Sequence, residues 1–257
     1  MIKNEVFATW CISNNIGDAL NVWMINKISG FDPIYVEKNE YCNKYMCIGS
    51  ILNWADRNTI VWGAGIANAN DPVDPRADIR AVRGPISRNR AIACGAQCPE
   101  VFGDPSILLP KMFNPEVKKK YELGIIPHYV DQFTVHNSWL SNCGDIKIIN
   151  VFDSVEQFIL QIKSCKKIIS SSLHGLIISD AYGIPSKWFQ ATNKIGGDDT
   201  KFHDYFLSVG YEIYKPLKFY DLINENVDII CKEIEERYIK IDLKGLLDAC
   251  PLMKGIK

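Results

Sequence analysis

The chain has 257 residues, of which 47% are hydrophobic and 23% charged, and its formal net charge is −1. These values are typical of a soluble globular protein of one large or two small domains, and the balanced charge gives no support for a nucleic-acid partner. No apolar stretch reaches the length of about 20 residues that a membrane-spanning helix needs. Nine scattered cysteines, without a CxxC pair or a matching histidine pair, favour reduced thiols in a cytoplasmic protein over a metal site.

The N-terminal half alternates segments of strand character with segments of helical period. The first expected strand is Val6–Trp10, and a helix is expected over Ala19–Ile28 with Gly30 just past its end. Further expected elements of this half are strands at Thr59–Trp62 and Ile79–Val82 and a helix that begins near Pro85. Strands that alternate with helices predict an α/β fold with a parallel sheet.

The segment Lys111–Lys120 interrupts this alternation, because it is charged, contains proline and lacks strand character. We therefore expect a boundary between an N-terminal domain 1–115 and a C-terminal domain 116–257. The expected elements of the second domain are strands at Leu123–Ile126, Lys147–Val151, Lys166–Ser170 and Ile184–Phe189, a helix capped by Ser154 that runs through Lys163, and a closing C-terminal helix within Tyr220–Leu247.

One loop stands out, because an apolar strand stops abruptly at Ser170-Ser171-Ser172-Leu173-His174-Gly175. A short helix is expected to follow and to end at Gly183. In a parallel sheet this loop lies at the carboxyl end of its strand, and the first N–H groups of the following helix attract anions. A histidine there can carry charge, protonate a substrate or hold a phosphate oxygen. The alternative is a loop histidine that only caps the helix.

The remaining polar motifs also follow expected strands, so we expect them to gather at one edge of a sheet. They are Asn15, Gly17, Asp18, Gly63, Gly65, Arg83, Asp104 and His128. No P-loop lysine motif and no Gly-x-Ser-x-Gly elbow occurs, which argues against an NTPase and against a hydrolase of that type. Cations at Arg83, His174, His128 and Lys201, with carboxylates at Asp18 and Asp104, suit an anionic donor and a hydroxyl acceptor.

With these motifs the chain resembles the polysaccharide pyruvyl transferase family. The resemblance spans roughly residues 15 to 206 and is carried by Asn15-Ile16-Gly17-Asp18, Trp62-Gly63-Ala64-Gly65, Val82-Arg83-Gly84-Pro85-Ile86-Ser87, Gly103-Asp104-Pro105, Ile126-Pro127-His128-Tyr129, Ser171-Ser172-Leu173-His174-Gly175, Ala181-Tyr182-Gly183-Ile184-Pro185 and Lys201-Phe202-His203-Asp204-Tyr205. Many family members have arginine just before the Leu-His pair, where this chain has Ser172. Arg83 and Lys201 are the expected substitutes for that donor-binding arginine.

The resemblance implies an α/β protein of two Rossmann-like domains that face each other across a GT-B-like cleft. It implies phosphoenolpyruvate as co-substrate and two sugar hydroxyls as acceptor, giving a pyruvate ketal and phosphate. We expect no other cofactor, and no metal, because the sequence has no dedicated cluster of metal ligands. The expected acceptor is a lipid-linked oligosaccharide of bacterial capsule or exopolysaccharide biosynthesis. We expect the enzyme to work in the cytoplasm, with peripheral contact at the inner membrane face through a run such as Lys118-Lys119-Lys120.

For this chemistry we expect roles for particular residues. The catalytic residues are expected to be His174 as acid or phosphate ligand, Asp18 as base on the acceptor side, and Arg83. The expected donor-binding residues are Ser171, Ser172, Leu173, Gly175, Lys201 and His128, and those of the acceptor side are Asn15, Gly17, Gly65 and Asp104, the last being second choice for the base. Two alternatives stay open: a GT-B glycosyltransferase that uses a nucleotide sugar, and a non-catalytic carbohydrate-binding relative.

Overall fold

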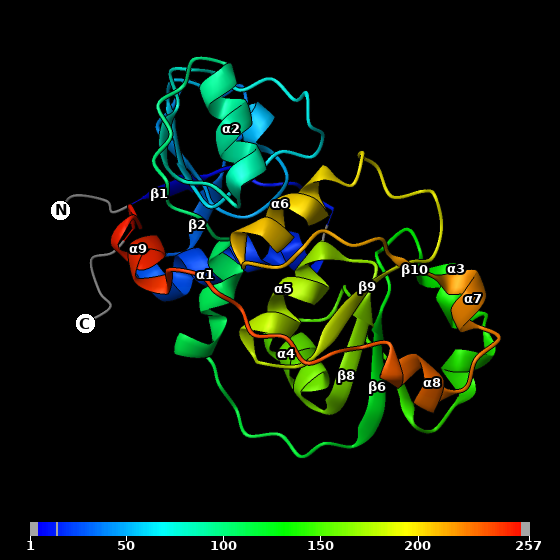
Figure 1. Cartoon of the computed structure of the whole chain (residues 1–257). Helices are drawn as coiled ribbons and strands as arrows, with labels where there is room; N and C mark the ends of the chain where they lie inside the picture. Colours follow the sequence, from blue (N-terminus) through cyan, green and yellow to red (C-terminus); the bar gives the residue numbers. More distant parts are fainter. Residues whose placement is uncertain (1–4, 14, 253–257) are drawn as a thin grey trace. The chain divides into compact units, whose positions relative to one another are not determined.

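The computed structural model describes residues 5–13 and 15–252, which form two compact units, each with its own parallel β-sheet. Of the described residues, unit 1 comprises 5–13, 15–106, 197–213 and 240–252, and unit 2 comprises 107–196 and 214–239. The colours of Figure 1 show that each unit draws on separate stretches of the chain. The α/β class with two parallel-sheet domains is therefore confirmed.

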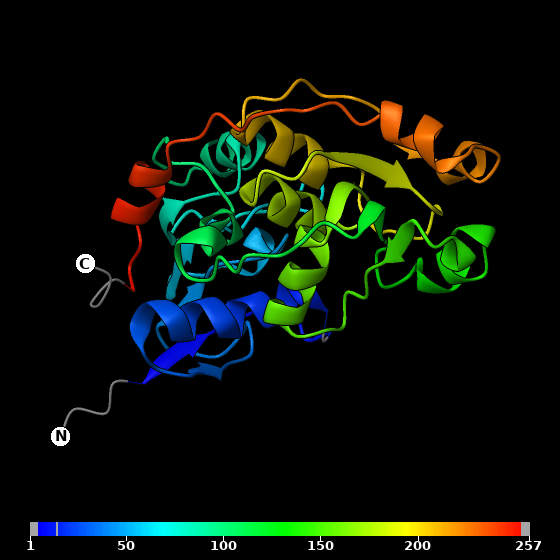
Figure 2. The same cartoon turned by 90° about the horizontal axis from the view of Figure 1, so that it is seen from below.

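Unit 1 is built on five described strands in the order β2-β1-β3-β4-β5, all parallel. The strands are β1 (Val6–Ala8), β2 (Pro33–Tyr35), β3 (Lys44–Met46), β4 (Thr59–Trp62) and β5 (Asp78–Ala81), and the helices are α1 (Ile16–Ser29), α2 (Pro85–Ala93), α6 (Thr200–Ser208) and α9 (Leu243–Asp248), with 3-10 turns at Leu52–Trp54 and, reaching into unit 2, at Pro105–Lys111. Figure 2 shows the blue helix α1 lying along the first strands of the same unit, consistent with its contacts to β2.

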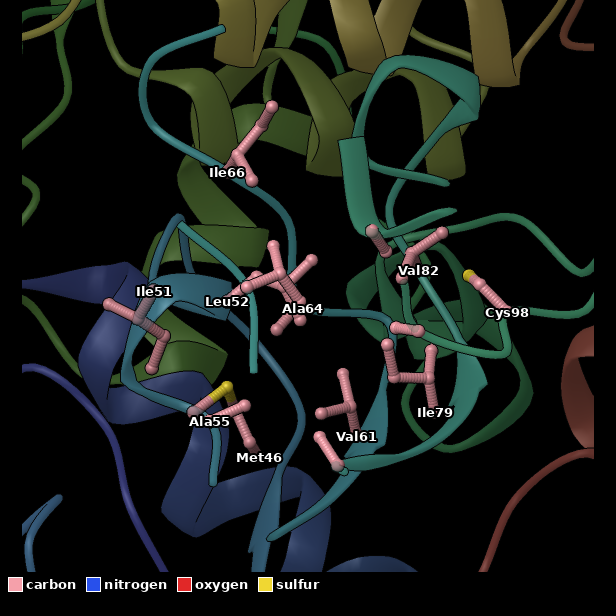
Figure 3. Close-up of a cluster of buried hydrophobic side chains, with 14 residues drawn as sticks. Met46, Ile51, Leu52, Ala55, Val61, Ala64, Ile66, Ile79, Val82 and Cys98 are labelled. Carbon is pink, nitrogen blue, oxygen red and sulfur yellow. The ribbon is translucent and has the colours of Figure 1, made fainter. Parts of the chain in front are cut away.

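The core of unit 1 lies between the middle strands and the segments that cover them. Figure 3 shows Met46, Val61 and Ile79, from three neighbouring strands, pointing into a cluster that also receives Leu52 and Val82. All five side chains are almost completely buried. The apolar residues that the sequence places at strand positions thus form the core, as the pattern predicts.

The ends of α1 follow from single residues. Asn15 is the N-cap, and its Oδ1 accepts a hydrogen bond of 2.9 Å from the backbone N–H of Gly17. The helix therefore begins at Ile16, three residues before the expected start, and its first turn includes Gly17 and Asp18. At the other end Gly30 adopts the left-handed conformation with φ of 78°, as expected for a glycine just past a helix.

Unit 2 has five described strands in the order β10-β9-β8-β6-β7, again all parallel. The strands are β6 (Tyr121–Ile126), β7 (Ile146–Ile148), β8 (Cys165–Ser170), β9 (Ser186–Gln190) and β10 (Leu217–Lys218), and the helices are α3 (Gln132–His136), α4 (Val155–Lys163), α5 (Leu173–Ala181), α7 (Phe219–Leu222) and α8 (Val227–Lys232), with a 3-10 turn at Trp139–Asn142. Helices α4 and α5 both pack on β8, and α8 contacts β6 (Figure 1). Ser154 caps α4 by accepting from the N–H of Gln157, which confirms the predicted helix start.

The two sheets share one topology. In each, the first strand along the chain pairs with the second strand on one side and with the third on the other. This is the 2-1-3-4-5 order of doubly wound folds, in which ligands bind where the strand order reverses. The switch point lies between β1 and β3 in unit 1 and between β6 and β8 in unit 2.

Two segments differ from the expected division at residue 115. Residues 197–213 and 240–252 belong to unit 1. Contacts within unit 1 explain both, because Asp204 of α6 pairs with Arg83, and the carbonyl of Leu246 accepts 2.8 Å from Trp62 Nε1. Among residues 5–13 and 15–252, no helix has the length and apolar character needed to span a bilayer.

The expected C-terminal helix is instead three short ones, α7, α8 and α9. The side chain of Asn226 accepts from Ile229 N and that of Asp242 accepts from Gly245 N, so each begins a new helix within the run. Asn and Asp are strong N-caps because their side chains compete for backbone N–H groups. A continuous helical period in the sequence did not reveal these interruptions.

Candidate functional site

The switch point of unit 2 brings two of the sequence motifs together. Strands β6 and β8 end level with each other, since Ile126 is paired with Ser170. The chain then continues the pairing for one more step, with Ser171 N donating to Ile126 O over 3.0 Å. The backbone N–H of His128 donates to Ser171 Oγ over 2.8 Å. The loops that follow the two strands are therefore joined directly where the topology predicts a ligand.

Helix α5 starts at this point. Ser172 is its N-cap, Leu173 and His174 are its first two residues, and Gly175 is the third. The first N–H groups of a helix lack intrahelical acceptors and carry the positive end of its dipole, which makes them an anion site. The Ser172 side chain does not cap these groups. A Cβ at Gly175 would overlap Ser170 Oγ, so glycine is needed for α5 to begin this close to the sheet.

The three serines of the loop have different roles. Ser170 Oγ donates to Ser172 O over 2.7 Å and accepts from Ser172 N, which closes the turn. Ser171 Oγ donates to Asp131 Oδ2 over 2.7 Å. Ser172 Oγ makes no hydrogen bond to the part of the chain that the structure describes. Ser171 and Ser172 were both predicted to bind the donor. The hydroxyl of Ser172 can donate a hydrogen bond to a ligand, whereas the hydroxyl of Ser171 already donates to Asp131.

Two histidines of unit 2, His128 and His174, lie at the same edge of the sheet. His174 is half-buried in the first turn of α5. His128 is held through its backbone N–H, and its ring lies against that of Tyr129 with 4.3 Å between the ring centroids. His128, Ser171, Ser172, Leu173, His174 and Gly175, all predicted from sequence, are therefore brought together by the loops after β6 and β8.

Asp131 is part of this arrangement and was not predicted. It is fully buried, and its two carboxylate oxygens accept from Ser171 Oγ and from Thr192 Oγ1, the latter over 2.6 Å. Thr192 follows β9, so Asp131 connects the ends of three neighbouring strands. The sequence signal was its place in the loop between β6 and the next helix, but that position alone is equally typical of an ordinary helix cap.

The corresponding edge of unit 1 holds Asn15, Gly17 and Asp18. Asp18 is 9% exposed, and its Oδ2 accepts from Ser13 N over 2.9 Å and from Asn15 Nδ2 over 3.0 Å. Its carboxylate is therefore fixed at the N-terminus of α1, where the helix dipole stabilises negative charge. The loop after β3 is tied to the same helix, because Asn21 and Ile48 exchange two hydrogen bonds of 3.1 and 3.0 Å.

Arg83 is buried inside unit 1, with 1% of its surface exposed. Its Nε pairs with Asp204 Oδ2 at 3.1 Å, while its two terminal nitrogens donate to Ser50 Oγ over 2.7 Å and to Ile66 O over 2.5 Å. A Cβ at Gly65 would overlap the guanidinium group, so Gly65 is required to make room for it. This geometry favours a structural role for Arg83 and for Gly65.

Two further predicted residues also belong to unit 1. Lys201 lies in the first turn of α6, although the sequence placed it in the second domain. Burial, together with the nearby positive charge of Arg83, lowers the pKa of Lys201 to about 8. Asp104 is 2% exposed and accepts from both the N–H and the hydroxyl of Ser106, at 2.9 and 2.6 Å, in the turn after Gly103. Those contacts are typical of a turn residue.

A family model and two curated relatives match most of the chain's length between them. The model of a family described as polysaccharide pyruvyl transferase matches residues 40–189. Uncharacterized protein L143 of Acanthamoeba polyphaga mimivirus is 31% identical over 238 residues, which are 88% of this chain and 82% of that protein. Succinoglycan biosynthesis protein ExoV of Rhizobium meliloti (strain 1021) is 27% identical over 216 residues, 79% of this chain but only 63% of ExoV.

A solved structure is also similar, namely that of a functionally uncharacterized protein from Klebsiella pneumoniae subsp. pneumoniae NTUH-K2044. It has a TM-score of 0.46 and 12% identity, and covers 84% of this chain and 92% of that one. The region matched by the family includes the loops of unit 2 with His128 and His174. Asp18 and Lys201 lie outside that region.

Proposed function

Because the chain belongs to the polysaccharide pyruvyl transferase family, we propose that it converts phosphoenolpyruvate and a sugar with two free hydroxyls into a pyruvate ketal and phosphate. The acceptor in this proposal is a short lipid-linked oligosaccharide of exopolysaccharide or capsule assembly. ExoV, which is named for succinoglycan biosynthesis, supports an exopolysaccharide acceptor.

The observation that carries the donor assignment is the start of α5 at the switch point of unit 2. Phosphoenolpyruvate carries about three negative charges and needs N–H donors and cations around it. The N–H groups of Leu173, His174 and Gly175 begin a helix there, and Ser172 adds a hydroxyl proton. We call this set, together with His128 and Ser171, the donor half-site. It belongs entirely to unit 2.

Chemistry at the donor needs a proton on its methylene carbon. His174 is the residue of the donor half-site that can deliver it, or that can hold a phosphate oxygen in its protonated form. One sugar hydroxyl then attacks the second carbon of the donor. The neighbouring hydroxyl attacks the same carbon, the bond from that carbon to the bridging oxygen breaks, and the bridging oxygen leaves as part of the phosphate while the ketal ring closes. The two hydroxyl protons leave with a base and with the phosphate.

Asp18 is the proposed base for the acceptor. Its Oδ2 is held by Ser13 N and Asn15 Nδ2 at the switch point of unit 1, so its position is fixed before a substrate arrives. Asn15 and Gly17 support it by starting α1, and Asp104 stays the second choice for the base.

The GT-B-like arrangement, the cytoplasmic location and the peripheral membrane contact through Lys118-Lys119-Lys120 stay predictions.

The decisive experiment offers the purified protein two donors in parallel. Phosphoenolpyruvate or a nucleotide sugar is incubated with a galactose- or glucose-containing lipid-linked oligosaccharide, and phosphate, nucleotide and glycan mass are measured. Phosphate release with a heavier glycan supports pyruvyl transfer. Nucleotide release from the sugar nucleotide supports a glycosyltransferase, and glycan binding without either product supports a non-catalytic relative.

A further inference from the structure

Asp131 is the centre of a directed hydrogen-bond network in unit 2. The N–H of His128 donates to Ser171 Oγ over 2.8 Å, and Ser171 donates its hydroxyl proton to Asp131 over 2.7 Å. On the other side Lys194 N donates to Thr192 Oγ1 over 3.1 Å, and Thr192 donates to Asp131 over 2.6 Å. Each hydroxyl thus accepts from the backbone and donates to the carboxylate, so the orientation of both is fixed.

A local role does not account for Asp131. It is the N-cap of α3, a position where an aspartate side chain normally accepts from N–H groups of the first turn. Its carboxylate makes no such bond to the described residues of α3. Its partners are instead 40 and 61 residues away in the chain. The buried carboxylate thus does not cap its own helix. It binds two hydroxyls from distant parts of the chain and thereby holds the loops at the strand ends together.

We propose that Asp131 is the positioning residue of the donor half-site: it sets the distance and orientation between the loops after β6, β8 and β9, and so aims the first N–H groups of α5 at the donor. The inference rests on the proposed function. The carboxylate need not touch phosphoenolpyruvate, because Ser171 stands between Asp131 and the start of α5.

The same network gives Ser171 and Ser172 different roles. Since the proton of Ser171 is committed to Asp131, the donor anion is left to the helix N–H groups, Ser172 and His174. An amide at position 131 presents N–H to one of the two hydroxyls. That hydroxyl must then turn its proton away, and the loop it belongs to loses its fixed position.

The test compares Asp131→Asn with Asp153→Asn, a matched carboxylate of unit 2 that accepts from Asn150 and Gln161 beyond the outer strand β7. We expect Asp131→Asn to raise the dissociation constant of phosphoenolpyruvate, measured by calorimetry on folded protein, at least about tenfold, since small misplacements at such sites cost rates and affinities of that order or more. The acceptor KM should change less than about twofold, and Asp153→Asn should leave donor affinity unchanged.

A double-mutant cycle with Ser171→Ala separates positioning from general destabilisation. If the two residues act together, Ser171→Ala weakens donor binding in the wild type but adds little in the Asp131→Asn background. If Asp131→Asn does not fold, Ser171→Ala and Thr192→Val each remove one of the two hydrogen bonds to Asp131. Each is expected to weaken phosphoenolpyruvate binding without a matching change in the acceptor KM.

The outcomes distinguish this inference from the proposal it rests on. Wild-type protein that binds no phosphoenolpyruvate overturns the proposed function and this inference with it. Wild-type binding that Asp131→Asn retains in full, or that Asp153→Asn weakens equally, overturns the positioning role alone.

Discussion

At the scale of single residues, His174 combines three properties. It lies in the first turn of α5, it follows a strand that ends at the switch point of unit 2, and it is half-buried. An anion attracted by the first N–H groups of α5 would lie beside this imidazole, which has the chemistry of a proton donor and of a phosphate ligand.

We expect His174→Ala to lower the transfer rate about a hundredfold or more, because a positioned acid typically contributes that much. Thermal unfolding should be almost unchanged, since a half-buried side chain in the first turn contributes little to the core. Initial rates of phosphate release, with a melting curve of the same sample, measure both. An alanine variant with near-native turnover removes His174 from the site.

Lys201 gives a pH dependence with a definite sign. Its pKa is lowered to about 8, so the side chain is cationic below that pH and neutral above it. If it binds the donor, the KM for phosphoenolpyruvate rises as the pH increases through about 8. Lys201→Arg stays charged and should shift this rise to higher pH. Lys201→Met should have a high KM at every pH, and a profile of the wild type that is flat between pH 7 and 9 contradicts the assignment.

At the scale of elements, α2 and α6 are joined through a carboxylate. The N-cap of α2 is Gly84, which has no side chain to offer, and Asp204 of α6 takes its place. Asp204 accepts from Ser87 N over 2.9 Å, from Ser87 Oγ over 2.6 Å and from Arg83 Nε. A Cβ at Gly84 would overlap the backbone of Asp204, so glycine permits this close approach. Both charged partners are buried, and each compensates the other.

Arg83→Ala is therefore expected to act on stability. Removing one partner of a buried ion pair leaves the other charge uncompensated and costs about 3–5 kcal/mol. Urea unfolding of Arg83→Ala and of Asp204→Asn should show losses of free energy of unfolding in the same range. If Arg83 instead binds the donor, as the sequence suggested, Arg83→Ala should raise the KM for phosphoenolpyruvate and leave the free energy of unfolding unchanged. Measuring both quantities for this variant decides between the structural and the donor-binding role.

The elements also show what a sequence reveals and what it does not. Thr59–Trp62 and the helix after Ser154 follow from local pattern, and both have the expected bounds. The loop from Ser171 to Gly175 was recognisable because small and polar residues interrupt an apolar run. Asp131 was not, because its partners are 40 and 61 residues away and nothing local distinguishes it from a helix cap. Asp204 lies in the motif Lys201–Tyr205, but its pairing with Arg83, 121 residues away, leaves no local signal. Arg83 looked available for a ligand because its partners Ile66, Ser50 and Asp204 lie 17, 33 and 121 residues away in the chain.

At the scale of the whole molecule, the two units repeat one strand order and place an acid after the first strand of each sheet. These are Asp18 in unit 1 and Asp131 in unit 2. Asp18 is held by groups of its own loop, whereas Asp131 is held by groups that follow two other strands. In the proposed function, the switch point of unit 1 serves the acceptor and that of unit 2 serves the donor.

Asp18→Asn tests that division. We expect it to reduce transfer strongly, because an amide cannot take the acceptor proton, and to leave the dissociation constant of phosphoenolpyruvate within about twofold of the wild type. Calorimetry with the donor alone and kinetics with varied acceptor measure the two effects separately. Loss of donor affinity with unchanged acceptor kinetics would reverse the assignment of the two units.

The route of the chain has a consequence for how the protein is made. It passes between the units at residues 106/107, 196/197, 213/214 and 239/240, so the first unit to be synthesised is the last to be completed. Until residue 204 has left the ribosome, the Arg83 guanidinium has no carboxylate to pair with, and until residue 246 follows, the indole N–H of Trp62 has no carbonyl. We therefore expect unit 1 to complete its folding only after unit 2 has been synthesised, unlike an N-terminal domain made of one continuous segment. A fragment cut near residue 115 is expected to be recovered as a chaperone client or an aggregate.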